Sequence, residues 1–186
     1  MVPLIVIALV VVLLPVVYVI GTYNRLVGLK NTVPESWRNV DAELQRRYDL
    51  IPNLVETVKG YAAHEREVFE EVTRARATAV GSRGTPGSQA VDENVLIRAL
   101  GKLFAVVEGY PELKASQNFL HLQDELVNTE DRIQAARRFY NGNVRTLNNA
   151  VEMFPSSIIA SIWGFQPAEY FEIESVAVRQ PPQVLV

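Results

Sequence analysis

Apolar residues recur at steps of three or four along most of this chain, and that spacing predicts long amphipathic helices. The first stripe lies in the run Tyr23 to Glu65, directly after an uncharged N-terminal segment. Its members are Leu26, Leu29 (or Lys30), Val33, Trp37, Val40, Leu44, Tyr48, Ile51, Val55, Val58 and Ala62. Val68, Phe69 and Val72 carry the pattern on towards Val80. Charged residues fill the other positions, so one helix face is expected to pack inward.

The N-terminal segment is apolar enough to cross a membrane. Val2 to Ile20 contains no charged residue. At about 1.5 Å per residue, such a helix can cross a hydrocarbon core of ~30 Å. The alternative is a cleaved signal peptide, but the segment has no basic start and no small-x-small cleavage motif, and its apolar run is too long. We therefore predict a retained span that continues into the long helix.

The basic residues near this span predict its orientation. Only the amino group precedes it, whereas Arg25, Lys30 and Arg38 follow it. Because basic residues accumulate on the cytoplasmic side of a span, we expect the N-terminus outside and the rest of the chain in the cytoplasm.

Two prolines fall within the first stripe, at positions 34 and 52. Thr32-x-x-Glu35 resembles a capping box, so either a new helix begins at Thr32 with Pro34 in its first turn, or the helix runs on with a bend.

Pro52 is unlike Pro34, because no capping motif precedes it and the apolar stripe continues on both sides of it. A proline inside a helix costs ~3 kcal/mol and leaves one carbonyl, here that of Tyr48, without its helical donor. We expect a kink near Ile51, with Asn53 or an arginine side chain covering that carbonyl. The alternative is a tight corner between two helices at this point.

Later segments show the same helical pattern with clear interruptions. Gly81 to Ser88 contains three glycines and a proline and predicts a flexible surface loop. Asp92 is placed to cap the next helix, and Gly109-Tyr-Pro111 ends it and suits the start of another. The inward positions of that helix are expected to be Leu96, Leu100, Leu103 (or Phe104) and Val107.

The last helix is predicted from about residue 112 to 153. Its stripe consists of Phe119, Leu122, Leu126, Thr129, Ile133, Ala136, Tyr140, Val144, Leu147, Val151 and Phe154. Gly142 interrupts helix propensity there, at ~1 kcal/mol relative to alanine. We expect the close approach of another backbone to explain this glycine; a binding notch is the alternative.

Pro155 should stop the last helix. Ser156 to Phe165 is apolar but too short to span a bilayer, so we expect it to pack on the bundle end, or alternatively to lie among lipid headgroups. Three aromatic residues should join this packing: Phe165, Tyr170 and Phe171. The tail after Glu174 has no core pattern, and we expect it to be extended or disordered, or captured by a partner.

Together these patterns predict an all-α protein, in which an N-terminal transmembrane helix continues into an antiparallel bundle of long helices. The expected organisation is an anchor over residues 1–23, a helical bundle over residues 24–155, and a short apolar segment with a tail over residues 156–186.

Composition removes several kinds of chemistry. The 186 residues carry a net charge of −3, which gives no field to attract nucleic acid, and they include no cysteine. Zinc-protease, α/β-hydrolase and P-loop motifs do not occur. Each histidine, His64 and His121, lacks the glutamate three residues earlier that di-metal bundles use, since Tyr61 and Asn118 stand there. We predict no catalytic residue, no cofactor and no metal site, and expect His64 to be exposed to solvent.

One charged group could be mistaken for an active site. Arg46 and Arg47 lie near Glu43, Asp49 and Glu56. Glu43 and Arg47 are four residues apart, a spacing typical of surface ion pairs worth ~0.3–0.5 kcal/mol. We interpret the group as a solvated face or a partner surface.

Several phrases of the chain resemble the LemA family of bacterial membrane proteins. They are Tyr23-Asn24-Arg25-Leu26-Val27, Ser36-Trp37, Arg46-Arg47-Tyr48-Asp49-Leu50-Ile51-Pro52-Asn53-Leu54-Val55-Glu56, Val58-Lys59-Gly60-Tyr61-Ala62, Arg138-Phe139-Tyr140-Asn141, Phe154-Pro155 and Trp163-Gly164-Phe165. The resemblance covers nearly the whole chain. It implies a membrane helix followed by a mostly cytoplasmic helical bundle, and it implies no reaction. The family has a magnetosome-associated branch, which no residue here singles out.

The functional hypothesis is a non-enzymatic, membrane-anchored scaffold or adaptor in the bacterial inner membrane. It would contact the lipid bilayer through residues 2–20, form homo-oligomers and bind other membrane proteins, with membrane proteases as one class suggested by the resemblance. The alternative is a sensor or ligand-binding module with a pocket near Pro52 and Gly142, lined by Tyr48, Asn53 and Tyr140.

Overall fold

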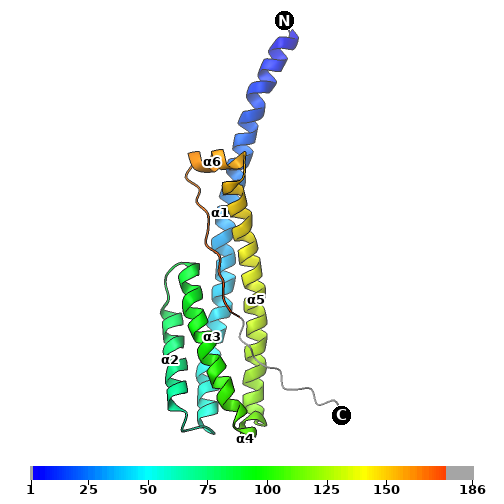
Figure 1. The fold of residues 1–186 in the computed structure, drawn as a ribbon. Coiled ribbons are helices and arrows are strands. Elements are labelled where there is room, and N and C mark those ends of the chain that lie inside the picture. Colours follow the sequence, from blue (N-terminus) through cyan, green and yellow to red (C-terminus); the bar gives the residue numbers. More distant parts are fainter. Residues whose placement is uncertain (1, 175–186) are drawn as a thin grey trace. The chain divides into compact units, whose positions relative to one another are not determined.

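A computed structural model describes residues 2–174, with side chains from Leu9 onward. Every regular element in this part of the chain is an α-helix (Figure 1). The helices are α1 (Val2–Lys59), α2 (Arg66–Gly81), α3 (Pro86–Glu108), α4 (Pro111–Lys114), α5 (Gln117–Glu152) and α6 (Ser156–Ile162). The predicted all-α class is therefore confirmed. The C-terminal tail after Glu174, and the expectation made for it, lie outside the described residues.

The first helix continues through both of its prolines. α1 is unbroken from Val2 to Lys59, so no new helix begins at Thr32 and no corner occurs at Pro52. The corner lies further on, in the turn between α1 and α2, and the expected continuation of one helix to Val80 is wrong. Gly60, a weak helix former, directly follows the last helical residue, which favours an end there.

The later helix boundaries correct two further predictions. Thr85, rather than Asp92, caps α3: its side-chain oxygen accepts a hydrogen bond from the Ser88 backbone N–H at 3.4 Å, and Pro86 fills the first helical position. The last long helix begins at Gln117 instead of residue 112, because a separate turn of helix, α4, starts at Pro111.

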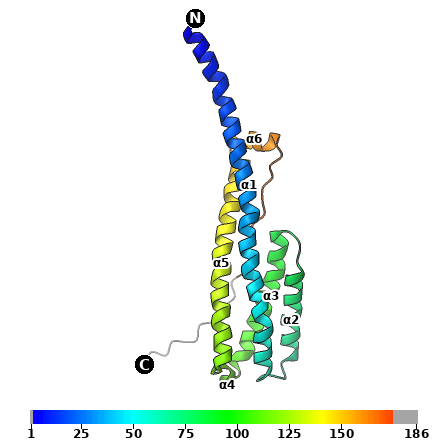
Figure 2. The same cartoon turned by 180° about the vertical axis from the view of Figure 1, so that it is seen from behind.

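The described chain divides into two compact units, to which α1 and α5 both contribute. Of the described residues, unit 1 contains 2–38 and 139–169, and unit 2 contains 39–138 and 170–174. Within unit 1, α1 and α5 lie side by side in opposite directions (Figure 2). Unit 2 adds the hairpin of α2 and α3 to the remaining turns of α1 and α5 (Figure 1). This antiparallel arrangement inside each unit agrees with the prediction.

The predicted stripes form the cores of the two units with few exceptions. On α1, Leu26, Val40 and Val58 are fully buried, and on α3, Leu100 and Leu103 are fully buried. Each such side chain contributes about 1.5–3 kcal/mol by leaving water. Phe154 is the clear exception, because 80% of it is exposed although the pattern placed it inside.

The segment after Pro155 packs on unit 1, as the preferred interpretation predicted. Ile159 and Ala160 of α6 are buried in a cluster with Leu26 and Ala150, and Phe165 completes it. Val19, Val27, Leu29 and Val151 pack against this cluster. Of the three aromatic residues predicted to join this packing, only Phe165 does: Phe171 is buried in unit 2, and Tyr170 is 37% exposed and outside the cluster.

A glycine ends α6 and turns the chain back along α5. Gly164 has a φ of +69°, and its N–H and that of Phe165 donate to Ser161 O at 3.3 Å and Ala160 O at 2.9 Å. This is a Schellman motif, in which glycine supplies the left-handed conformation. Asn148 then holds Ala168 through two hydrogen bonds, of 3.0 and 2.8 Å.

A buried charge cluster and an apolar end of unit 1 as candidate functional sites

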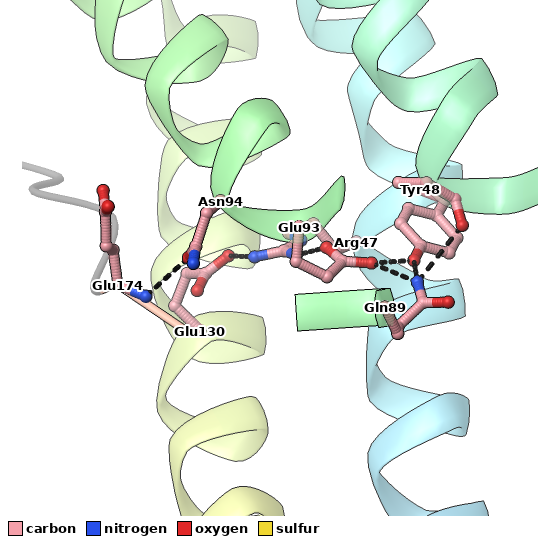
Figure 3. A network of polar contacts seen from close by, with 8 residues as sticks. Arg47, Tyr48, Gln89, Glu93, Asn94, Glu130 and Glu174 are labelled. Carbon is pink, nitrogen blue, oxygen red and sulfur yellow. Dashed lines mark hydrogen bonds and ion pairs between the residues drawn. The ribbon is translucent and has the colours of Figure 1, made fainter. Parts of the chain in front are cut away.

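Unit 2 contains a cluster of charged side chains that is closed to solvent. Arg47 of α1 donates through Nη2 to Glu93 of α3 and through Nη1 to Glu130 of α5, the latter at 2.9 Å (Figure 3). The side chains of Arg47 and Glu93 are both 0% exposed, and that of Glu130 is 10% exposed. One guanidinium thus connects three helices in the interior of the unit.

Two neutral groups extend the cluster. The Tyr48 hydroxyl donates to Oε1 of Glu93, and Gln89 Nε2 donates to the same oxygen at 2.7 Å. Gln89 also reaches the backbone carbonyl of Ala79 in α2, at 3.2 Å. The network therefore contacts all four long helical segments of unit 2, and it supplies donors to both oxygens of the buried Glu93 (Figure 3).

The surroundings shift the pKa of both groups that α1 contributes. Burial alone would lower the pKa of Arg47, but the negative charges of Glu130 and Glu93 outweigh it and raise the pKa. Burial, together with the Glu93 charge, also raises the pKa of Tyr48. Both groups therefore keep their protons: Arg47 stays a cation, and Tyr48 stays a neutral donor, neither of them a base.

The surface-pair interpretation of Arg47 was wrong. Glu43 pairs with Arg46 instead, at 3.7 Å, and the side chains of Arg46 and Glu43 are 58% and 20% exposed. Arg47 lies three residues after Leu44 and four before Ile51, which are both inward positions. Glu93 and Glu130 likewise stand at inward positions of their own helices, three residues before the buried Leu96 and Ile133 respectively. A charge at an inward step on each of three helices was the sequence signal that could have identified this cluster.

The carbonyl freed by Pro52 finds an arginine donor, as predicted. Arg76 of α2 donates from Nε to Tyr48 O at 2.6 Å. Asn53, the other expected donor, is exposed. This bond satisfies the acceptor that a mid-helix proline leaves without its helical N–H, so α1 can continue to Lys59.

The pocket expected near Pro52 and Gly142 does not have its predicted lining. Tyr48 is buried in unit 2 against Glu93, and Tyr140 is buried in unit 1, where it stacks edge-on with Trp37 at 5.2 Å between ring centroids. A Cβ added at Gly142 would meet nothing within 4 Å among the described residues, so the expected close approach of another backbone does not occur there.

Unit 2 does have an open groove, of about 630 Å³, between the end of α1 and α2. It is lined by Val55, Glu56, Lys59, Arg66, Phe69, Glu70, Thr73, Arg74 and Ala77. Its charged side chains carry both signs, and His64, which lies between α1 and α2, is exposed. Among the residues that the structure describes, no group of three or more His, Asp or Glu side chains could hold a metal ion.

The second candidate site is the apolar end of unit 1. α1 is long and apolar enough to cross a membrane by length and composition, and its residues from Leu9 to Tyr18 are exposed. Near the end of this apolar segment, Tyr23 contacts Trp163 and Phe165, with ring centroids 5.5 and 5.8 Å apart. These exposed apolar side chains at the start of α1 define the class of protein. It is a helical protein whose N-terminal helix is suited to a bilayer.

Comparison with known proteins agrees with this class and gives the family. The model of the LemA family matches residues 36–185, and the chain belongs to that family. It is 29% identical to the magnetosome protein MamQ of Magnetospirillum gryphiswaldense, over 80% of this chain and 64% of that protein. It is 30% identical to the magnetosome protein MamQ 2 of Paramagnetospirillum magneticum, over 81% and 64% of the respective chains. Protein LemA of Metamycoplasma hominis is 24% identical, over 89% and 72%.

The chain thus spans 64% of the length of the two MamQ proteins. The positions of Arg47, Glu93 and Glu130 lie within the matched range.

Proposed function

We propose that this LemA-family protein is a membrane-anchored, non-enzymatic scaffold or adaptor. The observation that carries the proposal is the unbroken passage of α1 from an uncharged segment with exposed apolar side chains into a packed helical core. Lipid would cover the first part, and helices of the same chain cover the second. The anchor would use residues 2–20 in a bacterial inner membrane, with the N-terminus outside and the helical units in the cytoplasm.

The polar groups of the core support a role in binding rather than reaction. The natural candidates for acid–base chemistry would be Arg47, Glu93 and Tyr48. In the interior, Arg47 and Tyr48 both donate hydrogen bonds to Glu93. A general acid or base must reach its substrate within hydrogen-bond distance, and these groups are closed to solvent. The names of the relatives state no enzymatic activity either.

Exposed apolar side chains on the long helices support self-association. Val91 is 63% exposed and Val95 41% exposed, one turn apart on α3, and Phe139 of α5 is 57% exposed. Apolar side chains left exposed on adjacent turns of a helix are typical of contact surfaces. We infer homo-oligomers in the membrane plane, together with other membrane proteins as partners; membrane proteases are one such class.

Gentle detergent extraction of the full-length chain tests the proposal. Size measurement is expected to give an assembly larger than a monomer, and mass spectrometry of the purified sample is expected to identify a membrane-protein companion. Val91→Ser with Val95→Ser should shift the assembly to a smaller size, whereas Arg83→Ser, in the exposed turn between α2 and α3, should leave it unchanged. A lone monomer without a companion would contradict the scaffold.

A further inference from the structure

The end of unit 1 carries apolar side chains that its own helices leave uncovered. From Met153 to Ala168 the chain contains no charged residue. Directly after α6, Trp163 is 48% exposed; on the helix itself Ile159 and Ala160 are buried, but Ile158 is 54% and Ile162 68% exposed. In the turn before it, Met153 is 60% and Phe154 80% exposed. We call these five residues the α6 apolar face.

This face lies beside the last turns of the uncharged segment of α1. Trp163 contacts the ring of Tyr23 at 5.5 Å, and Val19 packs against the cluster that holds Ile159 and Ala160. Both views show α6 directly beside α1, where the first helix leaves the partner helix α5 (Figures 1 and 2). The exposed apolar surface of the span therefore meets the α6 apolar face at Trp163.

The length of the span sets the depth of α6. At about 1.5 Å per residue, Val2 to Ile20 covers ~28 Å, close to the ~30 Å of a hydrocarbon core. Tyr23 then falls at the boundary between acyl chains and headgroups, and its contact places Trp163 at the same level. Tyrosine and tryptophan are enriched at this boundary. The first cations, Arg25 and Lys30, follow immediately, and Lys30 lies 5.8 Å from the Phe165 ring centroid.

We propose that the α6 apolar face inserts into the headgroup–acyl boundary of the leaflet where α1 leaves the membrane. This second, peripheral membrane contact rests on the proposed anchor. It fixes the orientation of unit 1 about the axis of α1. Lipid is the occupant that fits, because the face is uncharged and meets the exposed apolar surface of the span at Trp163. α1 alone could rotate about its axis, whereas α1 and α6 together present one particular side of unit 1 to the bilayer surface.

Depth-dependent fluorescence quenching tests the insertion in the full-length chain. Trp37→Phe leaves Trp163 as the sole tryptophan, since the chain has two. The protein is reconstituted into phosphatidylcholine vesicles brominated near either the headgroup end or the methyl end of the acyl chains. We expect bromine near the headgroup end to lower Trp163 emission by ~2-fold, and bromine near the methyl end to have a smaller effect, because tryptophan prefers the interface.

A matched control places the tryptophan elsewhere in the same unit. Phe139→Trp, combined with Trp37→Phe and Trp163→Phe, moves the reporter to an exposed position of α5 well before α6. Its emission should not respond to either lipid. Ile158→Ser with Ile162→Ser, in the chain whose sole tryptophan is Trp163, should reduce the quenching of Trp163. A fluorophore on Ile162→Cys gives the same readout with Trp37 intact, since the natural chain has no cysteine.

The outcomes separate the two proposals. Failure of the chain to float with the vesicles would overturn the anchor, and with it the insertion. Flotation with Trp163 unquenched by either lipid would overturn the insertion alone. If Ile158→Cys then cross-links between copies, a second copy covers the face in place of lipid, which equally refutes the insertion.

Discussion

Arg47 stands where an apolar residue would continue the stripe of α1, and it is nevertheless fully buried. Removing a charged side chain from water costs several kcal/mol, which only close and well-placed counter-charges offset. Glu93 and Glu130 supply these charges from two other helices. A buried ion group of this kind adds little net stability, but any helix register that separates its members leaves a charge unpaired. We hypothesise that it selects the alignment of α1, α3 and α5.

The cost of removing one partner tests this hypothesis. Arg47→Met leaves two carboxylates buried without their cation and should lower the free energy of unfolding by ~3–5 kcal/mol. Arg46→Met, which removes an ion pair of 3.7 Å whose arginine side chain is 58% exposed, should change it by less than ~1 kcal/mol. Urea unfolding followed by circular dichroism measures both. Adding Glu93→Gln and Glu130→Gln to Arg47→Met should recover most of the loss. Equal costs for the two arginines would refute the hypothesis.

A second residue-scale prediction concerns Pro52 and Arg76. Arg76→Met removes the donor to Tyr48 O and should cost ~1.5–3 kcal/mol, the range for hydrogen bonds to charged groups. In a Pro52→Ala background the residue 52 N–H can donate to that carbonyl, so the same Arg76 change should cost clearly less. Free energies of unfolding of the four variants form a double-mutant cycle. The absence of coupling would mean that Arg76 does not compensate for the proline.

At the scale of elements, the long helices are held by their stripes and ended by local signals. α3 ends at Glu108 and is followed by Gly109, and α4 opens on Pro111. α6 depends on Gly164 for its reversal. These ends determine which apolar faces can meet, because a helix that ran on would carry its stripe away from its partner.

Two glycines of unit 1 should respond oppositely to alanine. Gly164→Ala forces a left-handed conformation on a residue with a Cβ and should destabilise the protein by ~1–2 kcal/mol. Gly142→Ala adds a methyl group to an open helix position and should stabilise it by ~1 kcal/mol. Thermal unfolding in detergent, followed by circular dichroism, compares them. If Gly142→Ala destabilised the protein, that result would indicate a contact at the Gly142 face of α5 and contradict the open position.

For the whole molecule, the central question is which side of a membrane each part occupies. The basic residues after the span, beginning with Arg25, predict that the helical units lie in the cytoplasm. The absence of cysteine makes this measurable without background labelling.

Single cysteines report the orientation directly. In intact spheroplasts, an impermeant maleimide should label Val2→Cys, and it should label Arg83→Cys only after the membrane is broken. Arg83 lies in the exposed turn between α2 and α3, so its labelling after lysis serves as the control for reactivity. Labelling of Arg83→Cys in intact spheroplasts would reverse the predicted topology.

Local patterns anticipated much of this structure. The period of the apolar residues predicted the helices and their inward faces, and Pro52 predicted a carbonyl without its helical donor, covered by Asn53 or an arginine. The partners of Arg47 and of the Tyr48 carbonyl depended on other helices. Nothing near Arg47 in sequence indicates that Glu93 and Glu130 meet it, and nothing near Pro52 indicates that the donor is Arg76.

The sequence by itself determined the helical class, the uncharged segment fit for a bilayer and the breaks at glycine and proline, because these follow from residues a few positions apart. Only the tertiary structure decided that Arg47 is an interior residue, that Arg76 donates to the carbonyl freed by Pro52, and that α6 has one covered face and one exposed face. Each of these depends on contacts between distant segments, whose free energy outweighs the local preference.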